Sequence, residues 1–157
     1  MIHKCNFKHL PKEIQEDLKL IENRKYPQYI YVGRANKKYG LPECYLANHF
    51  KPSRDVSIHK CLENYKKSFD VHFLNYRKSQ AEFERLYEEG SIVRDGFWFN
   101  FRLTYPPSAR IMWALDCLKW WENKLSDIYL VCWCCKEMDD DTPCHGDIIK
   151  KILEETK

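Results

Sequence analysis

Apolar residues in the N-terminal part of the chain recur with the periods of one helix and one strand. Between residues 10 and 22 they return every three or four positions, at Leu10, Ile14, Leu18 and Ile21, which predicts an amphipathic helix. Residues 26–34 are rich in aromatic and β-branched side chains and stop at a glycine, so they predict a strand. The C-terminal end of that strand would carry Gly33 and Arg34.

The pattern of the central segment is mostly helical. Residues 35–52 contain a glycine and two prolines without a clear period, which indicates a long loop. Ser53 is expected to be the N-cap of a helix with apolar positions from Ile58 to Phe69. A second helical pattern covers residues 70–89 and is expected to stop at Gly90.

The C-terminal third of the chain alternates between strand and helix patterns. The aromatic residues 97–103 predict a strand or an exposed hairpin, and residues 106–108 are expected to start a helix. Residues 128–135 form an apolar strand pattern, and after a short loop an apolar helical pattern begins near Ile148. This alternation predicts an α/β fold: one small three-layer, Rossmann-like domain over residues 1–157, with a helical and aromatic insert at about residues 70–125.

Length and charge exclude several classes of protein. A chain of 157 residues suits one domain with its own core, and 26 basic against 23 acidic side chains give a net charge of only +3. Such a balance does not suit a protein that coats nucleic acid or a membrane through bulk charge. Neither a signal-like start nor a run of about 18 apolar residues is present, so we expect a soluble, cytoplasmic protein without a membrane partner.

The cysteines are the first candidate chemistry. Four of the eight lie between residues 132 and 144, and clustering of this kind favours thiolates at a site over a disulfide framework. Zinc prefers four Cys or His ligands, and the segment supplies Cys132, Cys134, Cys144 and His145. In an extended strand Cys132 and Cys134 would share a face while Trp133 packs opposite. Cys135 replaces Cys134 if the strand breaks there.

Two other interpretations of the cysteines stay open. They are either buried thiols that behave as small apolar side chains, or they include a reactive thiol. Cys144 would lie just before a helix, where the helix dipole stabilises a thiolate, with His145 beside it as a base. Cys132 and Cys135 also have the spacing of a redox pair.

An anion pocket is expected beside this cluster. Asp147 is either the N-cap of the last helix or a group that contacts a metal, a ribose or a leaving group, and the amides from Gly146 onward would face a phosphate. Arg34 is a candidate clamp for a phosphate or carboxylate. Arg54, expected in the first turn of a helix, suggests an anionic neighbour. The acidic residues 139–141 are expected to form a solvated loop.

The closing segment, Cys132-Trp-Cys134 followed by a loop, Cys144-His-Gly-Asp147 and an apolar helix, resembles the bacterial and phage family called domain of unknown function 4326. Earlier segments agree in order: Val32-Gly33-Arg34, then residues 47–50 with Asn48, then Arg54. This resemblance implies a ligand role for Asn48 and suggests a viral accessory role, but it implies no activity.

The leading hypothesis is a zinc-containing protein that binds a phosphate-bearing, nucleotide-like ligand through Gly33, Arg34, Asn48, Arg54 and Gly146. Whether it hydrolyses, transfers or only holds the ligand is left open, with Cys144, His145 and Asp147 as the catalytic candidates. One alternative is a nucleic-acid-binding zinc module that stacks single strands on its aromatic insert. The aromatic and basic residues of this alternative are Phe97, Trp98, Phe99, Phe101, Arg94, Arg102 and Arg110. Another alternative is docking of the insert on a host protein.

Overall fold

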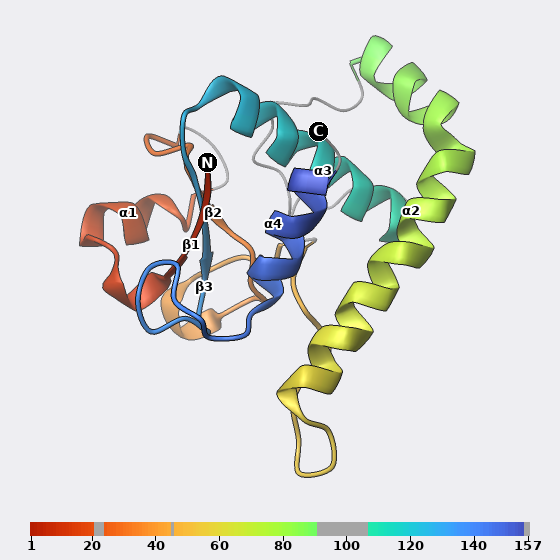
Figure 1. The fold of residues 1–157 in the computed structure, drawn as a ribbon. Coiled ribbons are helices and arrows are strands. Elements are labelled where there is room, and N and C mark those ends of the chain that lie inside the picture. The colour runs from red at the N-terminus through yellow and green to blue at the C-terminus, as the bar shows by residue number, and fades with distance from the viewer. Residues whose placement is uncertain (21–23, 45, 91–106, 156–157) are drawn as a thin grey trace.

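The fold is a small parallel sheet flanked by helices. The computed structural model describes residues 1–20, 24–44, 46–90 and 107–155. Its three strands are β1 (Ile2–Asn6), β2 (Tyr29–Tyr31) and β3 (Ile128–Cys132). They pair in the order β1-β3-β2, and both pairings are parallel (Figure 1). The prediction of a mixed α/β fold is therefore confirmed, and the carboxyl ends of all three strands lie at one edge of the sheet.

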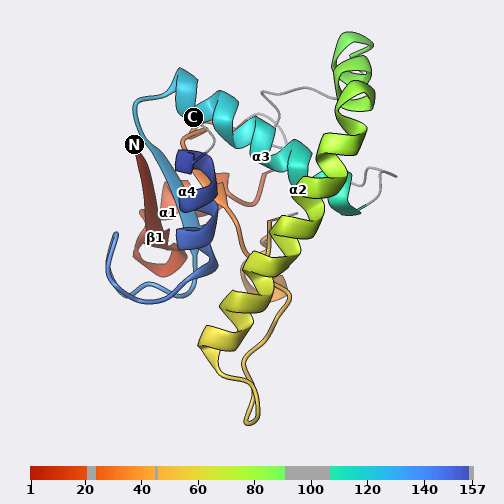
Figure 2. The same cartoon turned by 45° about the vertical axis from the view of Figure 1, so that its right-hand side comes forward.

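The described parts of the chain contain four α-helices: α1 (Lys12–Asp17) after β1, α2 (Ile58–Glu88) and α3 (Pro107–Lys124) between β2 and β3, and α4 (His145–Glu155) after β3. Two short 3-10 helices occupy Phe7–His9 and Lys37–Tyr39. The long α2 stands to one side of the sheet and packs against α3 and α4 (Figures 1 and 2). Among the described residues, none of these helices combines the length and apolar character needed to cross a membrane.

Side-chain alternation along β3 divides the core between the two faces of the sheet. Ile128, Leu130 and Cys132 belong to the larger apolar cluster, which also contains the buried residues of α2, α3 and α4. Val131 belongs to the smaller cluster on the other face, with Phe7 and the buried residues of α1. The central strand is apolar on both faces because helices cover both of them.

Several helix boundaries differ from those expected. The helix predicted over residues 10–22 is only α1, because the buried carboxylate of Asp17 accepts hydrogen bonds from the amides of Lys25 and Tyr26 and turns the chain. The two helices predicted over residues 58–89 are the single helix α2, and Gly90 follows its end with a φ of 75°. The N-cap of α2 is Ser57, not Ser53, and its side chain accepts from the amide of Lys60.

Strand β1 was not expected from the sequence. The strand predicted over residues 26–34 is limited to the three residues of β2, whereas the helix expected near residue 107 and the strand beginning at Ile128 are confirmed. The aromatic segment 97–103 lies outside the described residues, so the expected hairpin stays a prediction.

Candidate metal centre and adjoining pocket

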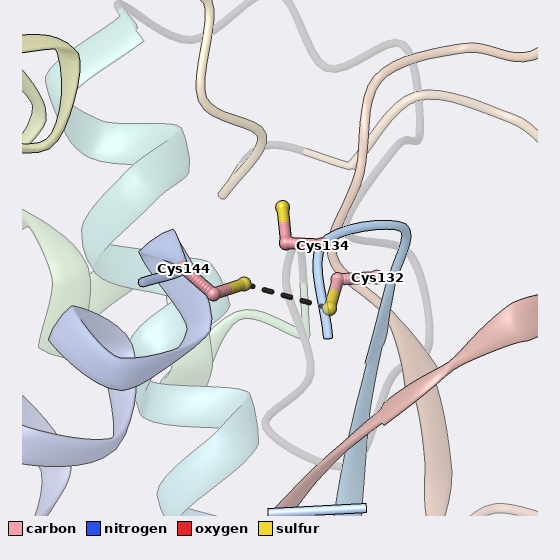
Figure 3. A group of neighbouring side chains, drawn as sticks. All are labelled: Cys132, Cys134 and Cys144. Atoms are coloured by element: carbon pink, nitrogen blue, oxygen red, sulfur yellow. Dashed lines mark hydrogen bonds between the residues drawn. The ribbon is translucent and has the colours of Figure 1, made fainter. Parts of the chain in front are cut away.

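Three cysteine sulfurs meet where β3 ends and α4 begins. The Sγ atoms of Cys132, Cys134 and Cys144 all lie within 4.8 Å of one another. The sulfurs of Cys132 and Cys144 are 3.4 Å apart, and the thiol of Cys144 donates to the sulfur of Cys132 (Figure 3). Cys132 is the last residue of β3, Cys134 lies on the loop that follows, and Cys144 directly precedes α4. In Figure 3 the sulfurs of Cys132 and Cys144 face each other, whereas the side chain of Cys134 points away from that pair in this view.

These sulfur separations suit a tetrahedral metal. With a Zn–S bond of about 2.3 Å, two thiolates on one zinc ion lie about 3.8 Å apart, which is close to the 3.4 Å between Cys132 and Cys144 and below the 4.8 Å limit of the group. The structure also favours Cys134 over Cys135 as the third possible metal ligand. Cys134 is exposed and belongs to the three-sulfur group, whereas Cys135 is buried in the core with its sulfur 3.7 Å from that of Cys132. Cys132, Cys134 and Cys144 are therefore a candidate metal site.

Hydrogen bonds determine where the protons of this cluster reside. The thiols of Cys134 and Cys144 and the amides of Cys135 and Cys134 hold the pKa of Cys132 well below its usual range. Cys132 in turn raises the pKa of Cys134 and Cys144, because a thiolate at Cys132 disfavours a second negative charge beside it. These hydrogen bonds favour the thiolate form at Cys132 over that at Cys144.

His145, the predicted fourth ligand, lies beside Cys144 but outside the group formed by the three sulfurs. Its Nε2 lies 2.7 Å from the carbonyl oxygen of Val32, and its Nδ1 lies 3.9 Å from the sulfur of Cys144. A carbonyl can only accept, so Nε2 carries the proton and Nδ1 keeps its lone pair. Burial lowers the pKa of His145, which keeps the ring neutral at neutral pH. A neutral imidazole held through its second nitrogen is the state in which histidine binds metals.

The loop between Cys135 and Cys144 is held by its acidic residues. Asp140 accepts hydrogen bonds from the amides of Lys136, Glu137 and Thr142, which lower its pKa to about 2. Asp139 accepts from the amide of Lys4. These carboxylates therefore stabilise the loop. A solvated acidic loop was predicted, but Asp139 and Asp140 are held by hydrogen bonds to backbone amides.

The start of α4 uses its polar groups internally. Cys144 occupies the N-cap position: its sulfur accepts from the amide of Gly146 at 3.4 Å, and its carbonyl accepts from the amide of Asp147. Asp147 is the third residue of α4 and not its N-cap. Its carboxylate accepts from the amide of Cys144 and from the ammonium of Lys4. These bonds leave the amides of residues 146 and 147 without the free donors that a phosphate would need.

A pocket of about 200 Å³ opens beside the sulfurs. Most of the ligand-binding and metal-binding residues expected from the sequence line it, namely Gly33, Arg34, Asn48, Cys132, Cys134, Cys144 and His145. Apolar side chains complete the wall, among them Phe50 and Ile58, which are 40% and 41% exposed. The pocket therefore joins the ends of β2 and β3 to the start of α4.

Arg34 gives this pocket its cationic wall. Its guanidinium Nη1 is buried and has no hydrogen-bond partner within the described residues. The backbone beneath is rigid, because the hydroxyl of Tyr31 donates to the carbonyl of Arg34 and accepts from the indole of Trp133. A Cβ at Gly33 would lie 2.4 Å from that hydroxyl, so Gly33 is needed for close packing.

Three other predicted residues lie differently from expectation. Arg54 is exposed, four residues before α2 begins and outside the pocket lining, so its placement in the first turn of a helix was wrong. Gly146 and Asp147 also lie outside the pocket lining. Apart from Arg110 in α3, the aromatic and basic residues of the nucleic-acid alternative lie outside the described residues, and that alternative stays a prediction.

Two residues of the site were missed altogether. Asn6 of β1 donates to backbone carbonyls on either side of Cys134, and Lys4 donates to the carbonyl of Thr142 and to the carboxylate of Asp147, on either side of Cys144. The available signal was the apolar positions Ile2, Cys5 and Phe7, which suit a short strand better than a loop.

Comparison with known proteins places most of the chain in one family match. The family described as Domain of unknown function (DUF4326) matches residues 18–155, which include β2, β3 and all three cysteines of the cluster. No curated protein and no solved structure matches the chain. Strand β1 lies outside the matched range.

Proposed function

The chain belongs to the family described as Domain of unknown function (DUF4326), and from this premise we propose a function on the basis of the site itself. The protein binds zinc at its sulfur cluster and a phosphate-bearing, nucleotide-like ligand in the adjoining pocket, within a three-layer, Rossmann-like arrangement. The observation that carries this proposal is that Arg34, whose buried Nη1 has no partner within the described residues, lines the same pocket as the three sulfurs.

Zinc is the metal that this set of ligands favours. Soft thiolates with an imidazole select zinc over the harder magnesium and calcium, which prefer oxygen ligands. Cys132, Cys134 and Cys144 supply three ligands, and Nδ1 of His145 supplies the fourth. The bond from His145 to the carbonyl of Val32 orients the ring for this role.

Arg34 and Asn48 would bind the anionic part of the ligand in the pocket. A buried guanidinium nitrogen without a partner costs free energy, which an anionic ligand would recover through charge-assisted hydrogen bonds. Asn48 also lines the pocket, and its Oδ1 already accepts from the amide of Phe50. Its Nδ2 group therefore remains as a donor, so the polar side chains of Arg34 and Asn48 both suit an oxygen-rich group such as a phosphate.

The apolar wall suits the remainder of such a ligand. Phe50 and Ile58 are large, partly exposed side chains in the pocket lining, and a flat base would cover them. We restrict the proposal to binding, because the carboxylate of Asp147 is occupied by Lys4 and by the amide of Cys144. Cysteine thiolates also persist in a reducing compartment, which is consistent with the cytoplasm.

The experiment has two parts, beginning with elemental analysis of the purified protein, which should give about one zinc per chain. The zinc-loaded protein is then titrated with adenosine monophosphate and with inorganic phosphate by calorimetry. Arg34→Gln should weaken adenosine monophosphate binding roughly 10- to 100-fold, as expected for the loss of a hydrogen bond to a charged group. Arg54→Gln, which replaces an exposed arginine outside the pocket, is the matched control and should bind as tightly as the wild type.

The metal site and the anion pocket can each be contradicted by a result that leaves the other intact. Protein without zinc after exposure to the metal would contradict the metal site. Zinc-loaded protein that binds neither probe, or that binds equally well after Arg34→Gln, would contradict the anion pocket. Binding of inorganic phosphate alone would retain the anion site and reject a nucleotide-like ligand.

A further inference from the structure

The first strand contributes two polar side chains that reach the sulfur cluster from the side. Lys4 and Asn6 lie on β1, which pairs with β3 so that Asn6 is opposite Cys132. Lys4 is buried, with only 6% of its surface exposed, which is rare for a lysine unless it is paired. Both residues precede the segment that matches the family.

Asn6 holds the backbone on both sides of Cys134. Its Nδ2 group donates to the carbonyl of Trp133 at 3.3 Å and to the carbonyl of Cys135 at 2.8 Å. One side chain thereby fixes the turn after β3. The same turn directs the amides of Cys134 and Cys135 toward the sulfur of Cys132.

Lys4 holds the other half of the cluster. Its ammonium donates to the carbonyl of Thr142 at 2.7 Å and to the carboxylate of Asp147 at 3.0 Å. The same carboxylate accepts from the amide of Cys144 at 3.2 Å. Lys4 thus connects β1, through Asp147, to the backbone that carries the Cys144 sulfur.

We propose that Asn6 and Lys4 are positioning residues that set the separation between the two halves of the metal site. Residues 133–135 are fixed by Asn6, and residues 142–147 by Lys4. Because both side chains project from one strand, the sulfurs of Cys132 and Cys144 are presented at binding distance before the metal arrives. This inference rests on the proposed zinc site, since it concerns the geometry of its ligands.

The physical expectation is a change in metal affinity beyond any change in fold stability. Groups that orient metal ligands without touching the metal typically alter affinity about 10- to 100-fold when they are replaced. A merely structural role for Asn6 and Lys4 would lower the stability of the protein and leave the affinity of the folded state unchanged.

The test uses the full chain with Asn6→Leu and Lys4→Met, which keep similar side-chain volume and remove the donors. Zinc affinity is measured by competition with a chromophoric chelator, and the geometry of the site by the absorption spectrum of the cobalt-substituted protein. Each variant should bind zinc about 10- to 100-fold more weakly than the wild type and show altered cobalt–thiolate bands. Lys4→Arg, which keeps the charge and the donors, should recover most of the affinity.

Ile2→Val is the matched control, because it removes a buried methyl group from the same strand without a polar contact to the cluster. It should lower the melting temperature and leave zinc affinity and the cobalt spectrum unchanged. Folded Asn6→Leu and Lys4→Met proteins with wild-type affinity and spectra would overturn the inference. If Lys4→Met does not fold, Lys4→Arg and Asn6→Leu decide. A wild-type protein that binds no zinc would instead overturn the proposed metal site.

Discussion

The two connections that border the pocket are built in contrasting ways. In the connection between β3 and α4, Asp140 accepts hydrogen bonds from three amides and Asp139 accepts one from the amide of Lys4 in β1. In the first turn of α4, the carboxylate of Asp147 is likewise occupied by Lys4 and by the amide of Cys144. Between β2 and α2, the buried guanidinium nitrogen of Arg34 has no partner in the described parts of the chain.

The connection between β2 and α2 also changes character along its length. Its first part is anchored, since the amide of Cys44 donates to the carbonyl of Gly33 and the hydroxyl of Tyr65 donates to the carbonyl of Leu46. Residues 50–55 are exposed, and this segment projects away from the sheet in both views (Figures 1 and 2). The contrast suits the proposed function: the protein itself arranges the proposed metal ligands, whereas the proposed anion site would be completed by its ligand.

The largest expected effect in the β3–α4 connection is the loss of zinc affinity when one of its sulfurs is removed. Cys144→Ala should reduce zinc affinity by more than about 100-fold, because a structural zinc site contributes on the order of 10 kcal/mol of binding free energy and loses one of its ligands. Chelator competition measures this change. Cys117→Ala, which removes a buried sulfur from α3, is the control and should keep the affinity of the wild type. Equal affinities in the two variants would contradict the assignment of Cys144.

Gly33 in the β2–α2 connection and Gly146 in the first turn of α4 permit a direct comparison. A Cβ at Gly33 would lie 2.4 Å from the hydroxyl of Tyr31, whereas a Cβ at Gly146 would lie 3.5 Å from the sulfur of Cys144, an ordinary contact. Gly33→Ala should therefore lower the free energy of unfolding by about 1–3 kcal/mol through overpacking. Gly146→Ala should leave it unchanged or raise it by up to about 1 kcal/mol, because alanine favours the helix. Urea denaturation of the metal-free proteins measures both values.

The cause of the expected loss at Gly33 can be isolated with a double-mutant cycle. In a Tyr31→Ala background the obstructing ring is absent, so adding Gly33→Ala should cost little further stability. An undiminished cost in that background would show that close packing against Tyr31 is not the reason for the glycine. A cost at Gly146 as large as that at Gly33 would remove the contrast between the two glycines.

The group of three sulfurs could be predicted from the sequence because its members are close along the chain. Cys132, Cys134 and Cys144 lie within 13 residues of one another, at the end of a strand, in the loop after it and directly before a helix. The alternation rule also placed Trp133 correctly on the face opposite Cys132, among Phe7 and Tyr39.

The residues that the sequence did not reveal depend on distant partners. Lys4 in a buried strand contradicts simple hydrophobic patterning, and only its pairing with Asp147, 143 positions later, makes its burial acceptable. Ser53 and Ser57 are equivalent as helix caps in the local sequence. A turn in which Ser53 and Val56 exchange backbone hydrogen bonds delays the helix to Ser57, and it leaves Arg54 outside the helix.

The smallest expected effect concerns the attachment of the β3–α4 connection to β1 by His3. Its ring lies 2.7 Å from a carboxylate oxygen of Asp139 and 3.0 Å from one of Asp127, and the hydrogen bond to Asp139 is the main reason why the pKa of His3 is raised. Protonated His3 therefore stabilises the fold. That contribution is fully present below the unfolded pKa of about 6.5, and it is lost as the pH rises through the higher folded pKa.

The free energy of unfolding of the metal-free protein, measured with urea at pH 6 and pH 8.5, should thus differ between wild type and His3→Gln mainly at the lower pH. Asp127→Asn removes one of the two carboxylates and should reduce this difference only in part. A difference that is independent of pH would mean that His3 acts by packing on the ring of Tyr129, 4.9 Å away, and not through its charge. In that case the connection carrying the metal ligands would be attached to β1 by Lys4 and Asn6 without an electrostatic contribution from His3.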